Sequence, residues 1–133
     1  MRRLIASCVA VSGALFSGLA LAQGTSGAKP LNGYTCMSLN ITDAQANDFH
    51  YHVPFYAKPS STSDVVGYAS SQVAVRVPAH TVDGFTEALF PTGAAVWIQS
   101  TLLRPYHSTL DPTARCVPTI LANGRVGFSY PHG

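Results

Sequence analysis

The segment Val53–Tyr106 reads VPFYAKPSSTSDVVGYASSQVAVRVPAHTVDGFTEALFPTGAAVWIQSTLLRPY. Short runs rich in β-branched and aromatic residues alternate in it with clusters of Gly, Pro, Ser and Asp. Runs of this length, bounded by turn residues, are typical of β-strands joined by tight connections. Several such strands in one short segment predict a small closed sheet. We therefore expect an all-β fold in which residues 49–106 form a barrel.

Alternation of apolar and polar residues predicts which side chains face the interior of this barrel. The predicted inward faces are, in chain order, Phe49, Tyr51, Val53 and Phe55, then Val73, Val75 and Val77, then Val96 and Ile98. Trp97 is out of phase with its two neighbours and is expected to point outward. An outward tryptophan is a suitable anchor for a partner.

Three stretches of this segment resemble the bacterial Src-homology-3-like domain family. Tyr56–Gly67, YAKPSSTSDVVG, is similar to the family's opening strand, its Pro-Ser loop and its Val-Gly strand. Gly84–Ala88, GFTEA, resembles its Gly-aromatic strand, and Val96–Leu103, VWIQSTLL, resembles its closing Gly-Trp-Val segment. The likeness covers about half of the exported chain. It implies a Src-homology-3-like barrel that is closed by a short helical turn at Ser100–Leu103.

The chain departs from this family pattern at three positions. Val96 stands where the family usually has Gly, and Ser71 stands where a turn Gly is expected. Leu102 occupies a position where a groove Tyr is common. The last difference argues against a proline-rich peptide as the ligand.

Residues 1–22 have the layout of a secretory signal peptide. A positively charged start, an apolar run of small residues and the cleavage site Ala20-Leu21-Ala22 follow one another. Ser and Gly interrupt the apolar run, which favours a cleaved signal over a membrane anchor. Cleavage is expected before Gln23, and the expected location of the mature chain is the periplasm.

The charge balance limits the kinds of partner. Removing the first 22 of the 133 residues leaves six basic and six acidic residues, so the mature chain is close to neutral. Charged residues make up 11% of the whole chain, less than half the usual share of about 25%. Nucleic acid and anionic membrane therefore have no electrostatic basis as partners. A surface so poor in charge is typical of a protein covered by another subunit, and an ordinary secreted domain with an uncharged Ser/Thr surface is the alternative.

Two cysteines, Cys36 and Cys116, remain after export. In an oxidising compartment such a pair, without C-x-x-C spacing, indicates one structural disulfide. It would close a loop of about 80 residues around the barrel and stabilise the fold by about 4 to 5 kcal/mol in the chain-entropy model. The alternative, a catalytic thiol, needs a nearby His and a lowered pKa. The missing C-x-x-C-H motif also argues against covalently bound haem.

The segments on either side of the barrel are predicted from turn and capping residues. Residues 23–48 are expected to hold a leader at Gln23–Lys29, a tight turn at Asn32-Gly33, a short strand at Tyr34–Leu39 and a helical turn capped by Asp43. Residues 107–133 are expected to add a hairpin. Its strands, Val117–Leu121 and Val126–Tyr130, flank Asn123-Gly124, a pair that favours a two-residue type I′ turn. We interpret the hairpin as an extension of the same domain.

The histidines are the remaining candidates for chemistry. His50 and His52 are spaced as in some zinc sites, and His80, His107 and His132 could supply a third ligand. No cluster of Cys, His and carboxylates accompanies them, so we interpret them as surface or interface residues. The chain also has no G-x-S-x-G motif. The sequence therefore predicts no catalytic residue, no metal and no cofactor.

These observations favour a non-catalytic accessory subunit of an exported, membrane-associated complex. In size, export signal and layout the chain resembles the small third subunits of the membrane-bound quinoprotein alcohol dehydrogenases of acetic acid bacteria. That resemblance implies a subunit that stabilises or positions a larger catalytic subunit, without quinone or haem of its own. The residues expected to contact the partner are Trp97, Tyr56, Tyr106 and Asn123. A cell-wall-binding module of the periplasm is the alternative function.

Overall fold

The computed structural model describes residues 28–132, and this part of the chain is almost entirely β-structure. In chain order the strands are β1 (Lys29–Pro30), β2 (Tyr34–Leu39), β3 (Pro54–Tyr56), β4 (Val65–Tyr68), β5 (Gln72–Arg76), β6 (Thr81–Val82), β7 (Phe85–Leu89), β8 (Ala95–Gln99), β9 (Leu103–Pro105), β10 (Val117–Ile120) and β11 (Val126–Ser129). One helical turn, α1 (Asp43–Ala46), and one 3-10 turn, η1 (Ser100–Leu102), complete it. The prediction of an all-β fold is confirmed. The predicted signal peptide, residues 1–22, lies outside the described residues.

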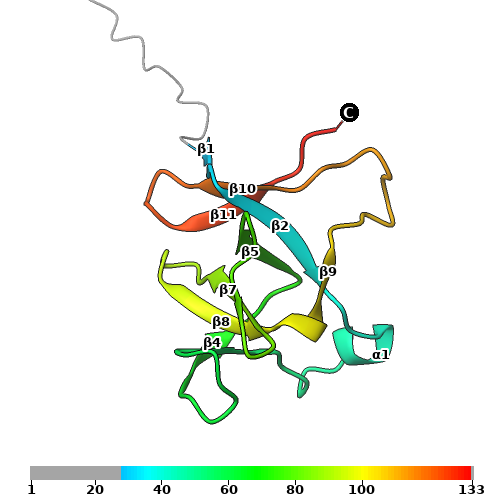
Figure 1. The fold of residues 1–133 in the computed structure, drawn as a ribbon. Helices are drawn as coiled ribbons and strands as arrows, with labels where there is room; N and C mark the ends of the chain where they lie inside the picture. The colour runs from blue at the N-terminus through cyan, green and yellow to red at the C-terminus, as the bar shows by residue number, and fades with distance from the viewer. Residues whose placement is uncertain (1–27, 133) are drawn as a thin grey trace, which may run out of the picture.

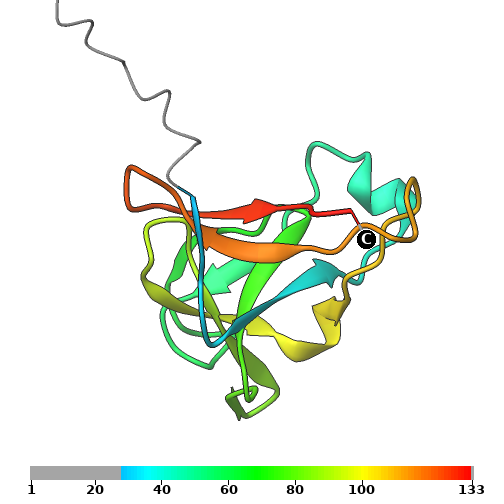
Figure 2. The same ribbon diagram turned by 90° about the horizontal axis from the view of Figure 1, so that it is seen from above.

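The strands form two antiparallel sheets (Figure 1). Eight of them make a barrel-like body in which the order is β4-β3-β8-β7-β5-β2-β9, with β6 paired to β7. The strands β1, β10 and β11 make a second, three-stranded sheet. Seen from above, the β10–β11 hairpin extends across the body (Figure 2). The predicted hairpin extension is therefore present, and it packs as a separate sheet.

The core of the barrel contains most of the residues that the alternation pattern predicts. Its buried members are Leu39, Val53, Phe55, Val73, Val75, Ala88, Val96 and Ile98. Ile98 and Ala88 are completely inaccessible, which places the centre of the core under β7 and β8. The alternation of Val96, Trp97 and Ile98 is confirmed, since the two aliphatic side chains are buried and the indole is on the opposite face.

Two residues that were predicted to face the core are exposed. Phe49 is 93% exposed, because the chain before β3 is a turn in which the N–H of Tyr51 donates to the carbonyl of Asp48. Val77 is 52% exposed, because β5 ends one residue earlier, at Arg76. In both cases the alternation of apolar and polar residues extends further along the sequence than the strand itself.

The sheet also begins earlier than residue 49. Strand β2, in the predicted N-terminal flank, pairs with β5 over five residues and with β9 over three. The following turn α1 is capped by Thr42 rather than by Asp43: the Thr42 hydroxyl accepts from the Gln45 N–H, and the Gln45 side chain accepts from the Thr42 N–H. This reciprocal pair is a capping box.

The predicted hairpin is present, but its predicted two-residue turn at Asn123-Gly124 is wrong. A two-residue turn that was not predicted occurs between β6 and β7. Asp83 and Gly84 both have positive φ, 51° and 82°, and they form the two-residue connection between β6 and β7. At the predicted site only Gly124 has a positive φ, 80°, and five residues separate Ile120 from its partner Val126. A type I turn followed by a glycine in the left-handed region is the usual alternative for a longer hairpin connection.

The predicted disulfide is confirmed. Cys36 in β2 and Cys116, just before β10, are joined with a Cα–Cα distance of 5.7 Å across 80 residues of sequence. The bond links β2 of the eight-stranded sheet to the residue that precedes β10 of the three-stranded sheet. Among residues 28–132, no helix is long and apolar enough to cross a membrane.

Candidate interaction surface

A row of four side chains crosses the outer face of the barrel. Strand pairing places Trp97 opposite Tyr56 on one side and opposite Glu87 on the other. The N–H of Glu87 donates to the carbonyl of His80, which brings the histidine beside β7. Residues that are directly opposite in antiparallel strands project to the same face. We call these four residues, His80, Glu87, Trp97 and Tyr56, the cross-strand row.

The charged members of the row are paired with one another. The Nδ1 atom of His80 is 2.6 Å from Oε2 of Glu87, and Nη1 of Arg76 is 3.6 Å from the same oxygen. The Glu87 side chain is largely covered, with 13% of it exposed, whereas Arg76 and His80 are about half exposed. A covered carboxylate between two basic groups is an internally satisfied arrangement.

The aromatic members of the row are also packed against neighbours. The His80 ring meets the Trp97 ring edge-on, with 5.2 Å between centroids. The Tyr56 ring meets Phe85 in the same way at 5.5 Å, and Tyr56 is only 9% exposed. Edge-to-face contacts at these distances add to the stability that burial provides. The accessible parts of the row are therefore His80, which is about half exposed, and part of the Trp97 side chain.

Strand β4 presents a contrasting surface. It is the end strand of the eight-stranded sheet, and among residues 28–132 only β3 pairs with it. Its sequence, VVGY, contains no charged residue, and Val65, Val66 and Tyr68 are 47%, 45% and 59% exposed. Natural sheets usually protect such an edge with charge, proline, a β-bulge or a covering loop. Strand β4 has a register shift against β3 but no charge. We call this strand, with its outward main-chain groups, the β4 edge.

Gly67 fixes which side chains of β4 point outward. A Cβ at this position would lie 2.5 Å from Cε2 of Phe90, so the inner side of β4 sits directly on that ring. Phe90 in turn packs edge-on against Phe55 of the core, with 6.0 Å between ring centroids. Because side chains alternate along a strand, Tyr68 projects to the outer side. The register shift between Phe55 and Tyr56 interrupts this alternation at Val66.

The other two residues that were predicted to contact a partner lie elsewhere. Tyr106 borders a shallow depression beside the disulfide, and its ring is 6.1 Å from that of Tyr130. Asn123 is at the exposed tip of the β10–β11 hairpin, where its side-chain oxygen accepts from the N–H of Arg125. The structure thus brings Trp97 and Tyr56 together and leaves Tyr106 and Asn123 in separate places.

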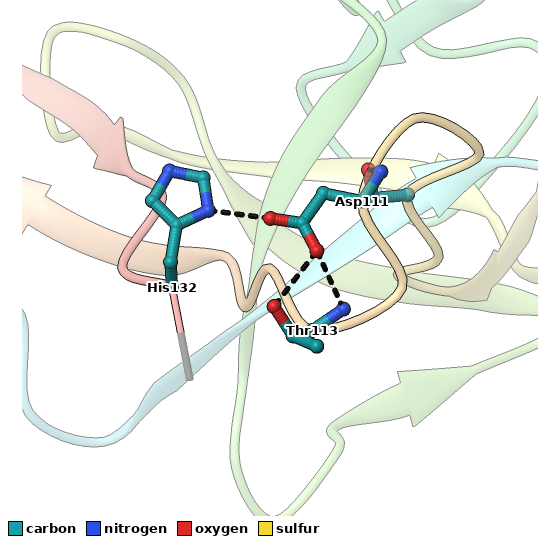
Figure 3. A network of polar contacts seen from close by, with 4 residues as sticks. Asp111, Thr113 and His132 are labelled. Carbon is teal, nitrogen blue, oxygen red and sulfur yellow. Dashed lines mark hydrogen bonds and ion pairs between the residues drawn. The ribbon is translucent and has the colours of Figure 1, made fainter.

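A polar cluster holds the end of the chain to the loop before β10 (Figure 3). The carboxylate of Asp111 accepts from the hydroxyl and the N–H of Thr113 at 2.7 and 2.9 Å. Its other oxygen is 2.6 Å from Nδ1 of His132. The hydrogen bonds from Thr113, and then the contact with His132, lower the pKa of Asp111 from 3.8 to about 2.

The remaining histidines do not form a metal site with their neighbours. His50 and His52 precede β3 and do not lie on a strand, and the His52 ring contacts the ring of Tyr68 at 5.0 Å. Within residues 28–132 no three His, Cys, Asp or Glu side chains are grouped as metal ligands. The zinc-like spacing in the sequence is therefore not matched by a cluster in the described structure.

The sequence pattern indicated the aromatic residues and left two features of this surface unpredicted. The pairing of Glu87 with His80 is one of them, since the two residues are seven positions apart and lie on opposite strands of a hairpin. The β4 edge is the other, and the available signal for it was a four-residue apolar strand without a gatekeeping charge. Comparisons with protein-family models, with curated proteins and with solved structures found no match. The geometry of the chain itself is therefore the basis for a functional assignment.

Proposed function

We propose that this chain is a non-catalytic accessory subunit of an exported, membrane-associated complex. In this role it binds a larger subunit and stabilises or positions it. The candidate complex is a quinoprotein alcohol dehydrogenase, by the resemblance in size and layout given above. The proposed location is the periplasm, and the proposed association with the membrane is indirect, through the partner.

The observation that carries the proposal is the β4 edge. A strand with three apolar side chains about half exposed, at the open end of a sheet, is an aggregation hazard in a protein that stays alone. The hazard disappears if a partner covers the strand. The nearly neutral mature chain supports the same role, because few charges would need to be desolvated in a complex.

A cell-wall-binding module is the second proposal, and one observation favours it. The Trp97 side chain is partly exposed, and its ring lies 5.2 Å from that of His80, which is about half exposed. A partly exposed aromatic residue with an adjacent polar group suits a saccharide or a peptide of the wall. In this proposal the cross-strand row, rather than the β4 edge, is the binding surface.

The test is recovery of a tagged full-length chain from the native envelope after mild detergent extraction. Recovery of one larger protein in a fixed molar ratio, retained at physiological salt, is the result expected for an accessory subunit. Identification of that protein as a quinoprotein would extend the assignment to alcohol oxidation. Recovery of peptidoglycan fragments without a stoichiometric protein would contradict the first proposal and support the second.

A further inference from the structure

We propose that Asn32 is a site of spontaneous deamidation in the folded chain, and that the isoaspartate formed there loosens the junction between the two sheets. Two asparagines, Asn32 and Asn123, are followed by glycine. The fold leaves the first of these pairs accessible to the reaction and protects the second. The inference goes beyond the proposed accessory function and does not depend on it.

The reaction needs only the chain and water. The main-chain nitrogen of the residue after an asparagine gives up its proton to hydroxide and attacks the side-chain carbon Cγ. A bond forms between that nitrogen and Cγ, the bond between Cγ and Nδ2 breaks, and Nδ2 leaves as ammonia with a proton from water. The cyclic succinimide that results takes up a water molecule and opens to aspartate or isoaspartate. A following glycine favours the attack, because it has no Cβ to crowd the nitrogen.

Both reacting groups are free at Asn32. The Gly33 N–H has no main-chain acceptor among the residues that the structure describes. In the same part of the chain, the side chains of Asn40, Asn47 and Asn123 each form a hydrogen bond, and the side chain of Asn32 forms none. Asn32 and Gly33 are exposed, and beyond the adjoining residues no atom lies within 4 Å of the place that a Cβ of Gly33 would take. The amide can therefore turn toward the Gly33 nitrogen, and the ring has room to close.

Both reacting groups are held at Asn123. The Gly124 N–H donates to the carbonyl of Leu121 at 2.9 Å. The Asn123 side-chain oxygen accepts from the N–H of Arg125 at 3.0 Å. This second bond polarises the amide, but attack cannot begin while the Gly124 N–H is engaged. Breaking one hydrogen bond of about 1 kcal/mol before the attack slows it by about fivefold.

The position of Asn32 gives the modification a structural consequence. It lies in the short connection between β1 and β2, which belong to different sheets (Figure 1). On one side of it the Leu31 N–H donates to the carbonyl of Pro118 at 2.8 Å. On the other side the Gly33 carbonyl accepts from the Val77 N–H at 2.9 Å. In isoaspartate the main chain runs through the side-chain carbons and is longer by one methylene, so one of these two hydrogen bonds must shift.

The test follows both asparagines in the purified full-length chain at mildly alkaline pH. Peptide mapping by mass spectrometry, with chromatographic separation of the aspartate and isoaspartate peptides, gives the rate at each position. In the folded chain we expect Asn32 to convert at least about fivefold faster than Asn123. In concentrated urea the hydrogen bond at Gly124 is lost, and the two rates should agree within about twofold.

Three variants separate the reaction from its structural effect. Asn32→Gln should stop conversion at this position, because the longer side chain closes a ring much more slowly. Its matched control, Asn123→Gln, should leave conversion at Asn32 unchanged. Asn32→Asp carries the charge of the product on an unaltered main chain. The isoaspartate form, separated by chromatography, should therefore have a lower thermal midpoint than Asn32→Asp.

Each result either supports or overturns the proposal. Equal rates in the folded chain, or faster conversion at Asn123, would overturn it. A difference that persists in urea would also overturn it, because the local sequence rather than the fold would then set the rate. Equal thermal midpoints for the isoaspartate form and Asn32→Asp would show that the junction tolerates the longer main chain, and the proposed loosening would be wrong.

Discussion

The cross-strand row and the β4 edge lie in the same sheet, yet they differ in how many of their polar groups and side chains already have partners within the chain. In the row, the Glu87 carboxylate has two basic neighbours, and both aromatic rings pack edge-on against others. In the edge, three apolar side chains are about half exposed, and the main-chain groups of Tyr68 face away from β3. The residues that look most like an interface in the sequence are thus largely occupied by one another. A surface that can bind a partner is therefore distinguished by exposed side chains without contacts in the chain, and residue type alone does not identify it.

The largest expected effect concerns the disulfide, on which both surfaces depend. Replacing Cys36 and Cys116 together by Ala should lower the free energy of unfolding by about 4 to 5 kcal/mol, because an 80-residue loop is no longer closed in the unfolded chain. Urea denaturation of a chain of residues 23–133 measures the loss. A loss below about 1 kcal/mol would mean that the two sheets hold together without the bond.

The next effect separates the two surfaces. Trp97→Ala should lower the free energy of unfolding by about 2 kcal/mol, since a partly buried indole and its contact with the His80 ring are removed. The matched change in the edge, Val66→Ala, should stay within about 0.5 kcal/mol because the side chain is nearly half exposed. Equal losses in denaturant midpoint for the two variants would show that the contrast between row and edge is wrong.

A smaller effect tests the inner side of β4. Gly67→Ala should destabilise the chain by about 1 to 2 kcal/mol, because the new methyl group meets the Phe90 ring at 2.5 Å and Phe90 must shift against Phe55. The thermal midpoint records this change. Combining Gly67→Ala with Phe90→Leu should recover part of the loss, and a failure to recover any of it would point to the backbone of β4 instead of the ring contact.

The smallest effect concerns acid. Because the pKa of Asp111 is lowered to about 2 in the folded chain, its contribution to stability is present above its ordinary pKa of 3.8 and is lost as the pH falls through 2. Asp111→Asn should therefore reduce the thermal midpoint slightly at pH 5 and by less at pH 2, where the folded carboxyl is already about half protonated. Carboxyl NMR titration of Asp111 gives the pKa directly, and a value near 3.8 would contradict the network of Figure 3.

The sequence predicted the features that depend on local chemistry and on period-two alternation. The fold class, the disulfide, the core positions around Val96 and Ile98, and the C-terminal hairpin are all confirmed. The ends of strands were less predictable, because the alternation at Phe49 and Val77 continues outside the bounds of β3 and β5. The type I′ turn was assigned to Asn123-Gly124 although Asp83-Gly84 has the equivalent signal, and only the strand register distinguishes them.

The candidate surface was harder to predict than the fold. An outward Trp97 follows from alternation, but its contacts with His80 and Glu87 depend on how the β6–β7 hairpin sits beside β8. The β4 edge depends on strand order, which no local pattern encodes, because any β-strand becomes an edge only when no other strand pairs with it. The residues expected to bind a partner were therefore selected by type, without knowledge of which groups the fold had already satisfied.

The most direct test of the proposal that a partner covers the β4 edge is amide hydrogen exchange at Tyr68 in residues 23–133, free and bound to any larger subunit that is co-recovered. In the free chain the Tyr68 amide is expected to exchange much faster than that of Trp97, because its N–H faces away from β3. On binding, the Tyr68 amide should become protected, while exchange at Trp97 stays the same. Unchanged exchange at Tyr68, with protection appearing at the cross-strand row instead, would contradict the proposal.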